Sequence, residues 1–215
     1  MDKIPETEVT LIRHGETEWN VQRRFQGHLD SPLTETGLRQ TEALGERFRD
    51  AKLDLVYSSD LMRTRRTAEA LVSVNGHEIR FDQRLREKNL GIFEGLNVEE
   101  IQARYPDDFK AFRNGGSQHR IEQGESSLNL LERAREFLKE VLLEHEGERI
   151  AVVTHGGFVR VILKHSLGLS QDTPTRFLIQ NTSVHRVVWK KDRWIVALLG
   201  DISHLNGFVP EKEQT

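Results

Sequence analysis

The sequence has no cysteine among its 215 residues, which excludes disulfides, thiolate metal sites, iron–sulfur clusters and cysteine nucleophiles. It also has no hydrophobic run near the roughly 18 residues of a membrane span, and its charged start lacks the apolar core of a secretory signal. We therefore expect a cytoplasmic protein with no membrane partner. Charge of one sign is not in excess, since 31 basic and 34 acidic residues give a net charge of −3. This balance argues against nucleic acid as the partner.

Short apolar runs alternate along the chain with segments of helical periodicity. The pattern predicts strands at 9–12, 53–57, 79–81, 150–153, 184–189 and 194–199, and helices at 36–49, 61–74, 125–144 and 158–167. We expect Ser59 or Asp60 to cap the helix at 61–74. This alternation predicts an α/β fold, with a three-layer, mainly parallel sheet of about six strands between helices. The length predicts a single domain over residues 1–215.

The segment at about 88–124 does not fit this alternation. Its glycines, together with Pro106, predict a small lid-like excursion of short helices and loops. We expect the residues that set substrate specificity to lie in it, between Gly91 and Gly124. Four of its aromatic residues would either wall a substrate pocket or form a small core of the lid: Phe93, Tyr105, Phe109 and Phe112. Beyond about residue 208 we expect the chain to fray.

Three of the predicted strands run directly into polar residues. Arg13 and His14 follow the first, Ser58–Arg63 ends the second, and His155–Gly157 follows the strand at 150–153. If these strands are parallel neighbours, two histidines and two arginines meet at one edge of the sheet. Arginine presents a fork of donors that matches phosphate oxygens, and a helix that begins at Gly156 also favours an anion. The sequence therefore predicts a phosphate site at this edge.

The chemistry of such a site follows from its histidines. A metal is disfavoured, because Arg13 places a fixed cation beside His14 and no two histidines are spaced four residues apart around a glutamate. A neutral imidazole beside a bound phosphoryl group can instead attack phosphorus and form a phosphohistidine. The leaving alkoxide then needs a proton, for which Glu16, Glu87 and Glu94 are the candidates.

The segment Leu11–Asn20, which reads LIRHGETEWN, resembles the opening motif of the histidine phosphatase superfamily, in its phosphoglycerate mutase-like branch. The resemblance continues in order, between about residues 8 and 200, through five further blocks: Gln26–Thr34, Ser58–Ala68, Leu85–Glu87, Gly124–Ser126 and Thr154–Gly157. Gly200–Leu205 adds a likeness to bacterial members described as probable phosphoglycerate mutases or phosphatases. Ordered blocks of this length leave little room for chance.

The resemblance implies a role for each matching residue. His14 is the nucleophile that becomes phosphorylated, and Arg13, Arg63 and His155 bind the phosphoryl oxygens. Glu87 protonates the leaving group and then serves as the base for the water that hydrolyses the phosphohistidine. The resemblance also implies that three positions make further polar contacts to phosphate or substrate: Asn20, Gln26 and Gly27. The resemblance implies no metal and, for hydrolysis, no cofactor.

Two departures from the family pattern bear on the reaction. Mutases read Gly-Leu-Asn-Lys where this chain reads Gly95–Val98, and they carry an arginine pair where Arg113 is here followed by Asn114. Each lost charged hydrogen bond weakens the binding of a bisphosphate by about 1–3 kcal/mol. The sequence therefore favours a phosphomonoesterase that acts on a small phosphorylated metabolite. The alternative is a cofactor-dependent phosphoglycerate mutase, which would interconvert 2- and 3-phosphoglycerate with 2,3-bisphosphoglycerate as cofactor.

Proteins of another class stay open at this point. The chain could be a catalytically weak phospholigand-binding protein that uses the same arginines, or a nucleic-acid binder through Arg63–Arg66, which the net charge disfavours. Arg23 and Arg24 would either steer an anion or be solvated, and His204 would either approach the site or belong to the tail. Both a monomer and a homodimer are compatible with the sequence.

Overall fold

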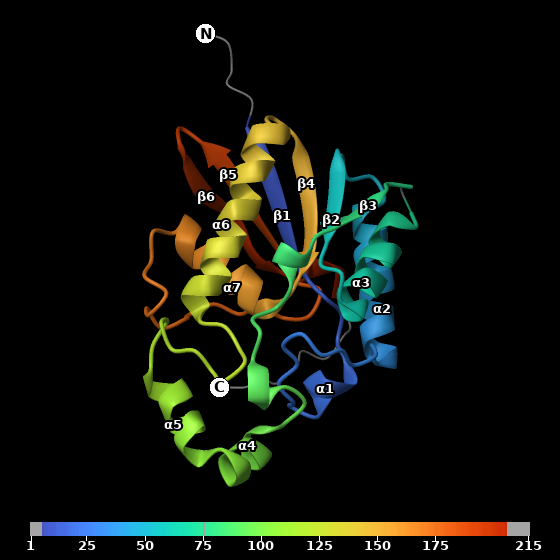
Figure 1. Ribbon diagram of the computed structural model, residues 1–215. Coiled ribbons are helices and arrows are strands. Elements are labelled where there is room, and N and C mark those ends of the chain that lie inside the picture. Colours follow the sequence, from blue (N-terminus) through green and yellow to red (C-terminus); the bar gives the residue numbers. More distant parts are fainter. Residues whose placement is uncertain (1–5, 75, 206–215) are drawn as a thin grey trace.

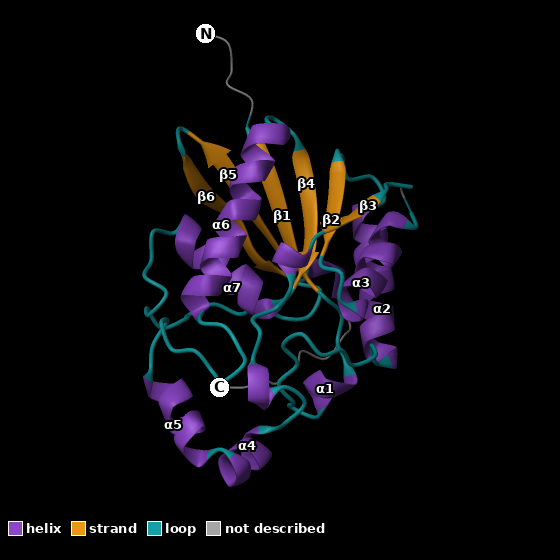
Figure 2. Ribbon diagram, viewed as in Figure 1, coloured by secondary structure: helices purple, strands orange, loops and turns teal. Residues whose placement is uncertain are grey.

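The computed structural model describes residues 6–74 and 76–205 (Figure 1). The strands of this part of the chain are β1 (Thr7–Arg13), β2 (Leu55–Ser58), β3 (Ile79–Phe81), β4 (Arg149–Thr154), β5 (Val184–Lys190) and β6 (Arg193–Asp201). The helices are α1 (Glu18–Val21), α2 (Glu35–Phe48), α3 (Met62–Val72), α4 (Val98–Arg104), α5 (Pro106–Asn114), α6 (Ser127–Glu144) and α7 (Gly156–Ser166). Helices cover both faces of a central sheet (Figure 2), which confirms the predicted α/β class.

The described strands form one six-stranded sheet in the order β3-β2-β4-β1-β5-β6. The four strands from β3 to β1 are mutually parallel, and β5 and β6 extend the sheet as an antiparallel hairpin. The sheet is therefore mainly parallel, as expected. In β1 and β4, Arg13 lies opposite Thr154, so His14 and His155 leave the sheet at the same edge. The predicted convergence of distant strand ends is confirmed.

Alternation along β1 separates two hydrophobic cores. Leu11 faces the core under α6 and α7, whereas Ile12 faces the core under α2 and α3. The buried faces of these helices complete both cores, whereas Leu38 and Leu128, in the first turns of α2 and α6, are 48% and 39% exposed.

The start of α3 differs from the prediction. Leu61 occupies the N-cap position and makes no side-chain cap, so neither Ser59 nor Asp60 has the expected role. The carboxylate of Asp30, from a distant loop, instead accepts a hydrogen bond from the Met62 backbone N–H at 2.8 Å. A long-range contact thus replaces the local cap, and spacing along the chain could not indicate it.

The lid-like excursion consists of a 3₁₀ turn, α4 and α5, and it lies beyond the carboxyl edge of the sheet (Figure 1). Phe93, Ile101 and Ile121 form its fully buried core, and the other aromatic residues pack around Phe93. Of the two alternatives for these aromatic residues, the structure therefore supports the small core. Arg24 anchors the lid through an ion pair with Glu100 at 2.5 Å. The tail expected to fray lies outside the described residues.

Candidate active site

A pocket of about 760 Å³ opens beyond the ends of β1 and β4, which is within the size range of small-molecule sites. Eight of the nine residues predicted for the site line it: Arg13, His14, Asn20, Gln26, Gly27, Arg63, Glu87 and Gly156. The ninth, His155, is fully buried, and its ring centroid lies 5.4 Å from that of His14. The structure thus brings all nine residues together.

Hydrogen bonds fix which nitrogen of His14 can act as a nucleophile. Its Nδ1 lies 2.7 Å from the carbonyl oxygen of Gly15, which can only accept, so Nδ1 carries the proton. The lone pair of Nε2 is therefore available at the pocket. The backbone on either side of this ring is also held, since Asn181 Nδ2 donates to the His14 carbonyl and the Gly15 N–H donates to Thr67. A side chain that is only 4% exposed is thereby kept in one orientation.

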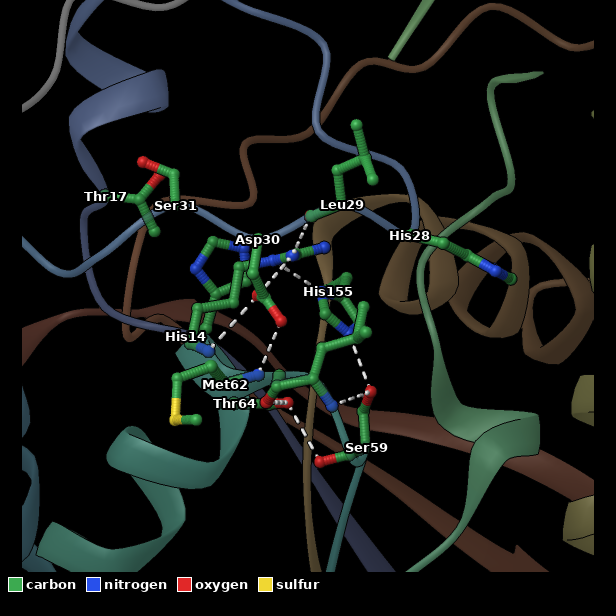
Figure 3. Close-up of polar contacts among 12 residues, drawn as sticks. His14, Thr17, His28, Leu29, Asp30, Ser31, Ser59, Met62, Thr64 and His155 are labelled. Atoms are coloured by element: carbon green, nitrogen blue, oxygen red, sulfur yellow. Dashed lines mark hydrogen bonds and ion pairs between the residues drawn. The ribbon is translucent and has the colours of Figure 1, made fainter. Parts of the chain in front are cut away.

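His155 has the opposite tautomer. Arg63 Nε donates to its Nδ1 at 3.2 Å, so the proton is on Nε2, which donates to Ser59 Oγ at 3.0 Å. Figure 3 shows the two imidazoles close together, with Ser59 on the far side of His155. Arg63 and Ser59 thus hold the His155 ring next to the nucleophile, and both ring nitrogens of His155 are engaged with the protein.

Arg63 is almost wholly committed to the protein itself. It is 1% exposed, and besides His155 it donates to the carbonyl oxygens of Gly27 and Leu29 at 2.7 Å each and to Asp30 at 2.8 Å. Four of the five N–H groups of its guanidinium are used in this way. One N–H remains for a phosphoryl oxygen, so Arg63 supplies positive charge and a single donor rather than a free fork.

Burial keeps both histidines neutral. It lowers the pKa of His14 well below its ordinary value, and the positive charges of Arg63 and Arg13 lower that pKa further. Burial also lowers the pKa of His155 well below its ordinary value, and the positive charge of Arg63 lowers it further. A histidine must be neutral to attack phosphorus, so this environment prepares His14 for nucleophilic chemistry at neutral pH.

Arg13 and the N-terminus of α7 lie on the same wall of the pocket. One terminal nitrogen of Arg13 donates to the carbonyl oxygen of Ile179 at 2.7 Å, which directs the guanidinium along that wall. A side-chain carbon added at Gly156 would lie 3.6 Å from Nε of Arg13, in ordinary contact. Gly156 and Gly157, at the start of α7, therefore line the same space as the arginine.

Glu87 is held against the second residue of that helix. One of its oxygens accepts from the Gly157 N–H at 2.9 Å and the other from the Lys88 N–H at 2.7 Å. A side-chain carbon at position 157 would lie 2.2 Å from Glu87 Oε1, so only glycine leaves room for this arrangement. The carboxyl group thereby lies among the residues that line the pocket with His14.

The two other candidate acids are engaged elsewhere. Glu94 lies outside the pocket lining, and its Oε1 accepts from the backbone N–H groups of His28 and Leu90 at 2.9 Å each. Glu16 lines the pocket, but its Oε1 accepts from Thr34 Oγ1 at 2.6 Å. Of the three carboxylates, Glu87 alone lies beside the N-terminus of α7 in the described structure.

The three positions expected to contact phosphate or substrate differ in what they offer. Asn20 Oδ1 accepts from the Thr17 N–H, which leaves its amide nitrogen to the pocket. Gln26 Oε1 is buried without a partner, so it can accept from a ligand hydroxyl or amide. Gly27 has φ +53°, and its carbonyl accepts from Arg63, so its part is to shape the loop.

Sequence reasoning missed several residues that build the site. Asp30 lies within a quoted block, yet its bond to Arg63 joins residues 33 apart, and Asn181 had no motif to mark it. None of residues 91–124 lines the pocket, so the lining gives no support to the expectation that specificity lies there. The outer wall of the pocket is instead the irregular segment 175–180, which has no periodicity to detect.

A mainly parallel α/β sheet with a histidine nucleophile and two arginines in a pocket at its carboxyl edge can hold a phosphoryl group beside that nucleophile, as phosphoryl-transfer proteins do. The family model described as histidine phosphatase superfamily (branch 1) matches residues 9–202, and the chain belongs to this superfamily. It is 39% identical over 203 residues to a protein of Erwinia tasmaniensis named probable phosphoglycerate mutase GpmB, with 92% of this chain and 94% of that protein covered. The corresponding protein of Escherichia fergusonii is 38% identical, with coverage of 93% and 95%.

Solved structures with this fold include named phosphatases. The YhfR protein of Bacillus stearothermophilus has a TM-score of 0.85 at 34% identity, and the match covers 93% of this chain and 99% of the YhfR chain. A mycobacterial glucosyl-3-phosphoglycerate phosphatase in complex with VO3 has a TM-score of 0.80 at 29% identity, with coverage of 90% and 98%. The relatives therefore include proteins named for both reactions, mutase and phosphatase.

Proposed function

We propose that this protein is a phosphomonoesterase that hydrolyses small phosphorylated metabolites through a phosphohistidine at His14. The observation that carries the proposal is the placement of an unprotonated His14 Nε2 in a pocket with Arg13, Arg63 and the Glu87 carboxyl group. The Coulomb field of the two arginines favours a bound phosphoryl dianion and stabilises charge that develops on its oxygens.

The reaction takes place in two balanced steps. In the first, the Nε2 lone pair of His14 attacks phosphorus, the bond from phosphorus to the ester oxygen breaks, and Glu87 gives that oxygen its proton. In the second, Glu87 takes a proton from water, whose oxygen attacks phosphorus as the bond to Nε2 breaks. Inorganic phosphate leaves, and His14 is neutral again. Arginine side chains supply the positive charge in both steps, so we propose that no metal or other cofactor takes part.

Hydrolysis is favoured over a mutase reaction by the residues at the lid. Val98, at the position of the mutase lysine, is 41% exposed at the start of α4, and neither it nor Arg113 lines the pocket. The lid therefore offers no cation to retain a bisphosphate between half-reactions. A phosphohistidine formed here is released to water rather than returned to a bound glycerate.

The test is a panel of phosphomonoesters assayed for phosphate release in the presence of a chelator, with 3-phosphoglycerate included with and without 2,3-bisphosphoglycerate. We expect hydrolysis, an acid-labile phosphoenzyme in rapid-quench experiments, and the loss of both in His14→Ala by at least about a thousandfold. His119→Ala, in the lid and away from the pocket, is the matched control. Isomerisation that is stimulated by the bisphosphate and exceeds phosphate release would instead establish the mutase.

A phospholigand-binding protein remains the second candidate, because Arg63 is so fully engaged with the protein that it has only one donor left. Such a protein would bind vanadate or phosphate with equal affinity before and after His14→Ala and would release no phosphate from any ester. Turnover by the wild-type protein that disappears in this variant excludes it.

A further inference from the structure

The turn that precedes β5 holds the backbone of the nucleophile. Asn181 Nδ2 donates to the carbonyl oxygen of His14 at 2.9 Å, and the Thr182 N–H donates to the same oxygen at 3.3 Å. A further hydrogen bond joins the Thr182 N–H to the carbonyl oxygen of Arg13 at 3.1 Å. Both turn residues are buried, and Thr182 is wholly inaccessible to solvent. The position of the His14 imidazole therefore depends on the conformation of this turn.

Thr182 has a backbone conformation that its own side chain disfavours. Its φ is +55°, in the left-handed region, which a β-branched residue occupies only at a cost in free energy. Such a conformation persists only where the surrounding structure fixes it. The contacts of Thr182 must therefore supply the free energy that keeps the turn in this shape.

One contact to Thr182 comes from a residue 22 positions further along the chain. His204, in the 3₁₀ turn Ser203–Leu205, has its Nε2 3.2 Å from Thr182 Oγ1. Its other ring nitrogen, Nδ1, lies 3.2 Å from a terminal nitrogen of Arg47, on α2. A guanidinium can only donate, so Nδ1 accepts and the ring proton is on Nε2. His204 therefore donates a hydrogen bond to the hydroxyl oxygen of Thr182.

The hydrogen bonds around His204 link α2 to the turn that holds the nucleophile. Arg47 also donates to the carboxylate of Asp201 at 2.5 Å, which fixes its guanidinium beside the histidine. Thr182 accepts from His204 and donates its own hydroxyl proton to the carbonyl oxygen of Asn181 at 2.8 Å. The series therefore determines the tautomer of His204 and the orientation of the Thr182 hydroxyl together.

Packing alone does not account for the contact between His204 and Thr182. The buried residue of the 3₁₀ turn is Leu205, whereas His204 is partly exposed, so the imidazole is not needed to fill the core. A side chain that only covered α2 would not have to direct an N–H group at a hydroxyl beside the nucleophile. The direction of the hydrogen bond indicates a role at the site.

We propose that His204 is a positioning residue for phosphoryl transfer, which holds Thr182 in its left-handed conformation and thereby fixes the backbone of His14. His204 does not line the pocket, so it acts through Thr182 and not on the substrate. The proposal rests on the proposed function, because it gives His204 a part in the step that forms the phosphohistidine. Of the two alternatives that the sequence left for His204, this is an approach to the site, made through one intervening residue.

The experiment separates the hydrogen bond of His204 from the volume of its ring. In His204→Gln the side-chain amide can donate near the position of Nε2 and accept from Arg47, whereas His204→Phe keeps a ring and removes both functions. We expect His204→Gln to keep kcat within about threefold and His204→Phe to lose about ten- to a hundredfold, because a small displacement of a reacting group costs up to about a hundredfold.

The loss should lie in kcat and not in KM. Arg13 and Arg63 bind the phosphoryl group whether or not His204 is present, so KM should change by less than about twofold in both variants. Kinetics with the fastest ester of the phosphomonoester panel measures both constants. Rapid-quench experiments should show phosphoenzyme formation slowed in His204→Phe by the same factor as kcat.

A double-mutant cycle tests whether the effect passes through Thr182. Thr182→Val removes the hydroxyl that His204 contacts and keeps the branched side chain. If His204 acts through that hydroxyl, the double variant Thr182→Val with His204→Phe is no slower than Thr182→Val alone.

The matched control is His145→Phe. His145 is a buried histidine whose Nε2 lies 3.1 Å from the hydroxyl of Tyr57, and it follows α6 at the other edge of the sheet (Figure 1). This variant loses a hydrogen bond between a histidine and a hydroxyl far from the pocket, so it should keep the kcat of the wild-type protein. Urea unfolding checks that each variant is folded in the assay.

Each contrary outcome has a separate meaning. A His204→Phe variant with the kcat of the wild-type protein overturns the positioning role and leaves the phosphatase in place. So does a His204→Gln variant as slow as His204→Phe, which would show that the ring matters and not its N–H group. Additive losses in the cycle overturn the route through Thr182.

A second variant covers the case in which His204→Phe does not fold. His204→Asn keeps an acceptor for Arg47, but its shorter side chain does not reach Thr182, so it should be slow where His204→Gln is fast. Equal kcat in these two variants overturns the positioning role. If the wild-type protein hydrolyses no ester of the panel, the proposed function fails, and the role of His204 in that reaction fails with it.

Discussion

At the scale of single residues, the absence of a side chain at position 157 determines where Glu87 lies. The Gly157 N–H donates to Glu87 at 2.9 Å, and any side-chain carbon there would overlap the carboxyl group. The overlap is with the end of a flexible side chain, so Glu87 can move away at little cost in folding free energy. A substitution at position 157 can therefore displace the acid without destabilising the fold.

We predict that Gly157→Ala lowers kcat about a hundredfold for alkyl phosphates, whose leaving oxygen needs a proton, because general acid catalysis contributes about 10²–10⁴-fold. For p-nitrophenyl phosphate, whose leaving group is stable as an anion, the loss should be below about tenfold. Steady-state kinetics with the two substrates measures the difference, and urea unfolding checks that the fold is intact.

Glu87→Gln provides the comparison for this variant. If Gly157→Ala acts only by displacing Glu87, the double variant is no slower than Glu87→Gln alone, since the two substitutions remove one interaction. Additive losses would contradict this interpretation, as would equal losses for the alkyl and aryl substrates. Either result would show that Gly157→Ala does not act by displacing a proton donor at Glu87.

At the scale of elements, the beginning of α3 is fixed by a residue outside it. Asp30 accepts from the backbone N–H of Met62 and from the guanidinium of Arg63. Figure 3 shows this carboxylate between the helix end and the neighbouring loop. One acidic side chain thus caps the helix and offsets the charge of an arginine that is otherwise buried.

We predict that Asp30→Asn destabilises the protein by about 1–3 kcal/mol, because it removes the carboxylate that is ion-paired with the buried Arg63. The change should also weaken vanadate binding, since Arg63 supports His155. Urea unfolding at pH 7 measures the first effect and titration with vanadate the second. The control is Glu46→Gln, which removes an ion pair of two exposed side chains with Arg49 and should leave stability nearly unchanged.

Prediction from sequence succeeded for elements with a periodic pattern and a fixed place in the sheet. The apolar runs at 9–12 and 150–153 are nearly continuous, as in strands that are buried on both faces, so the residues that follow them could be placed at one edge. The cap by Asp30 and the pocket wall at 175–180 could not be placed in this way. Both depend on contacts between irregular segments, whose positions are set by packing rather than by local propensity.

At the scale of the whole molecule, burial lowers the pKa of five histidines in the described part of the chain: His14, His155, His165, His185 and His204. His14 and His155 lie at the pocket, whereas His185 lies on β5 and His204 in a 3₁₀ turn that packs against α2. Burial lowers the pKa of His185 to about 4, and burial with the charge of Arg47 lowers that of His204 to about 4. His204 thus serves the packing of the chain after β6, through its contacts with Arg47 and Thr182.

These lowered pKa values make folding stability dependent on pH, and we predict that the free energy of unfolding falls as the pH drops from 6.5 to 4. In this range the unfolded chain binds protons at histidines that stay neutral in the folded protein, so acid favours unfolding. Each fully buried histidine contributes roughly 1.4 kcal/mol per pH unit while only the unfolded form is protonated. Above pH 6.5 both states are neutral at these positions, and the contribution is complete. Urea unfolding at a series of pH values measures the slope, which should decrease by about one proton in His185→Gln. An unchanged slope in that variant would show that His185 is protonated in the folded protein as readily as in the unfolded chain, and that burial in β5 does not control its charge.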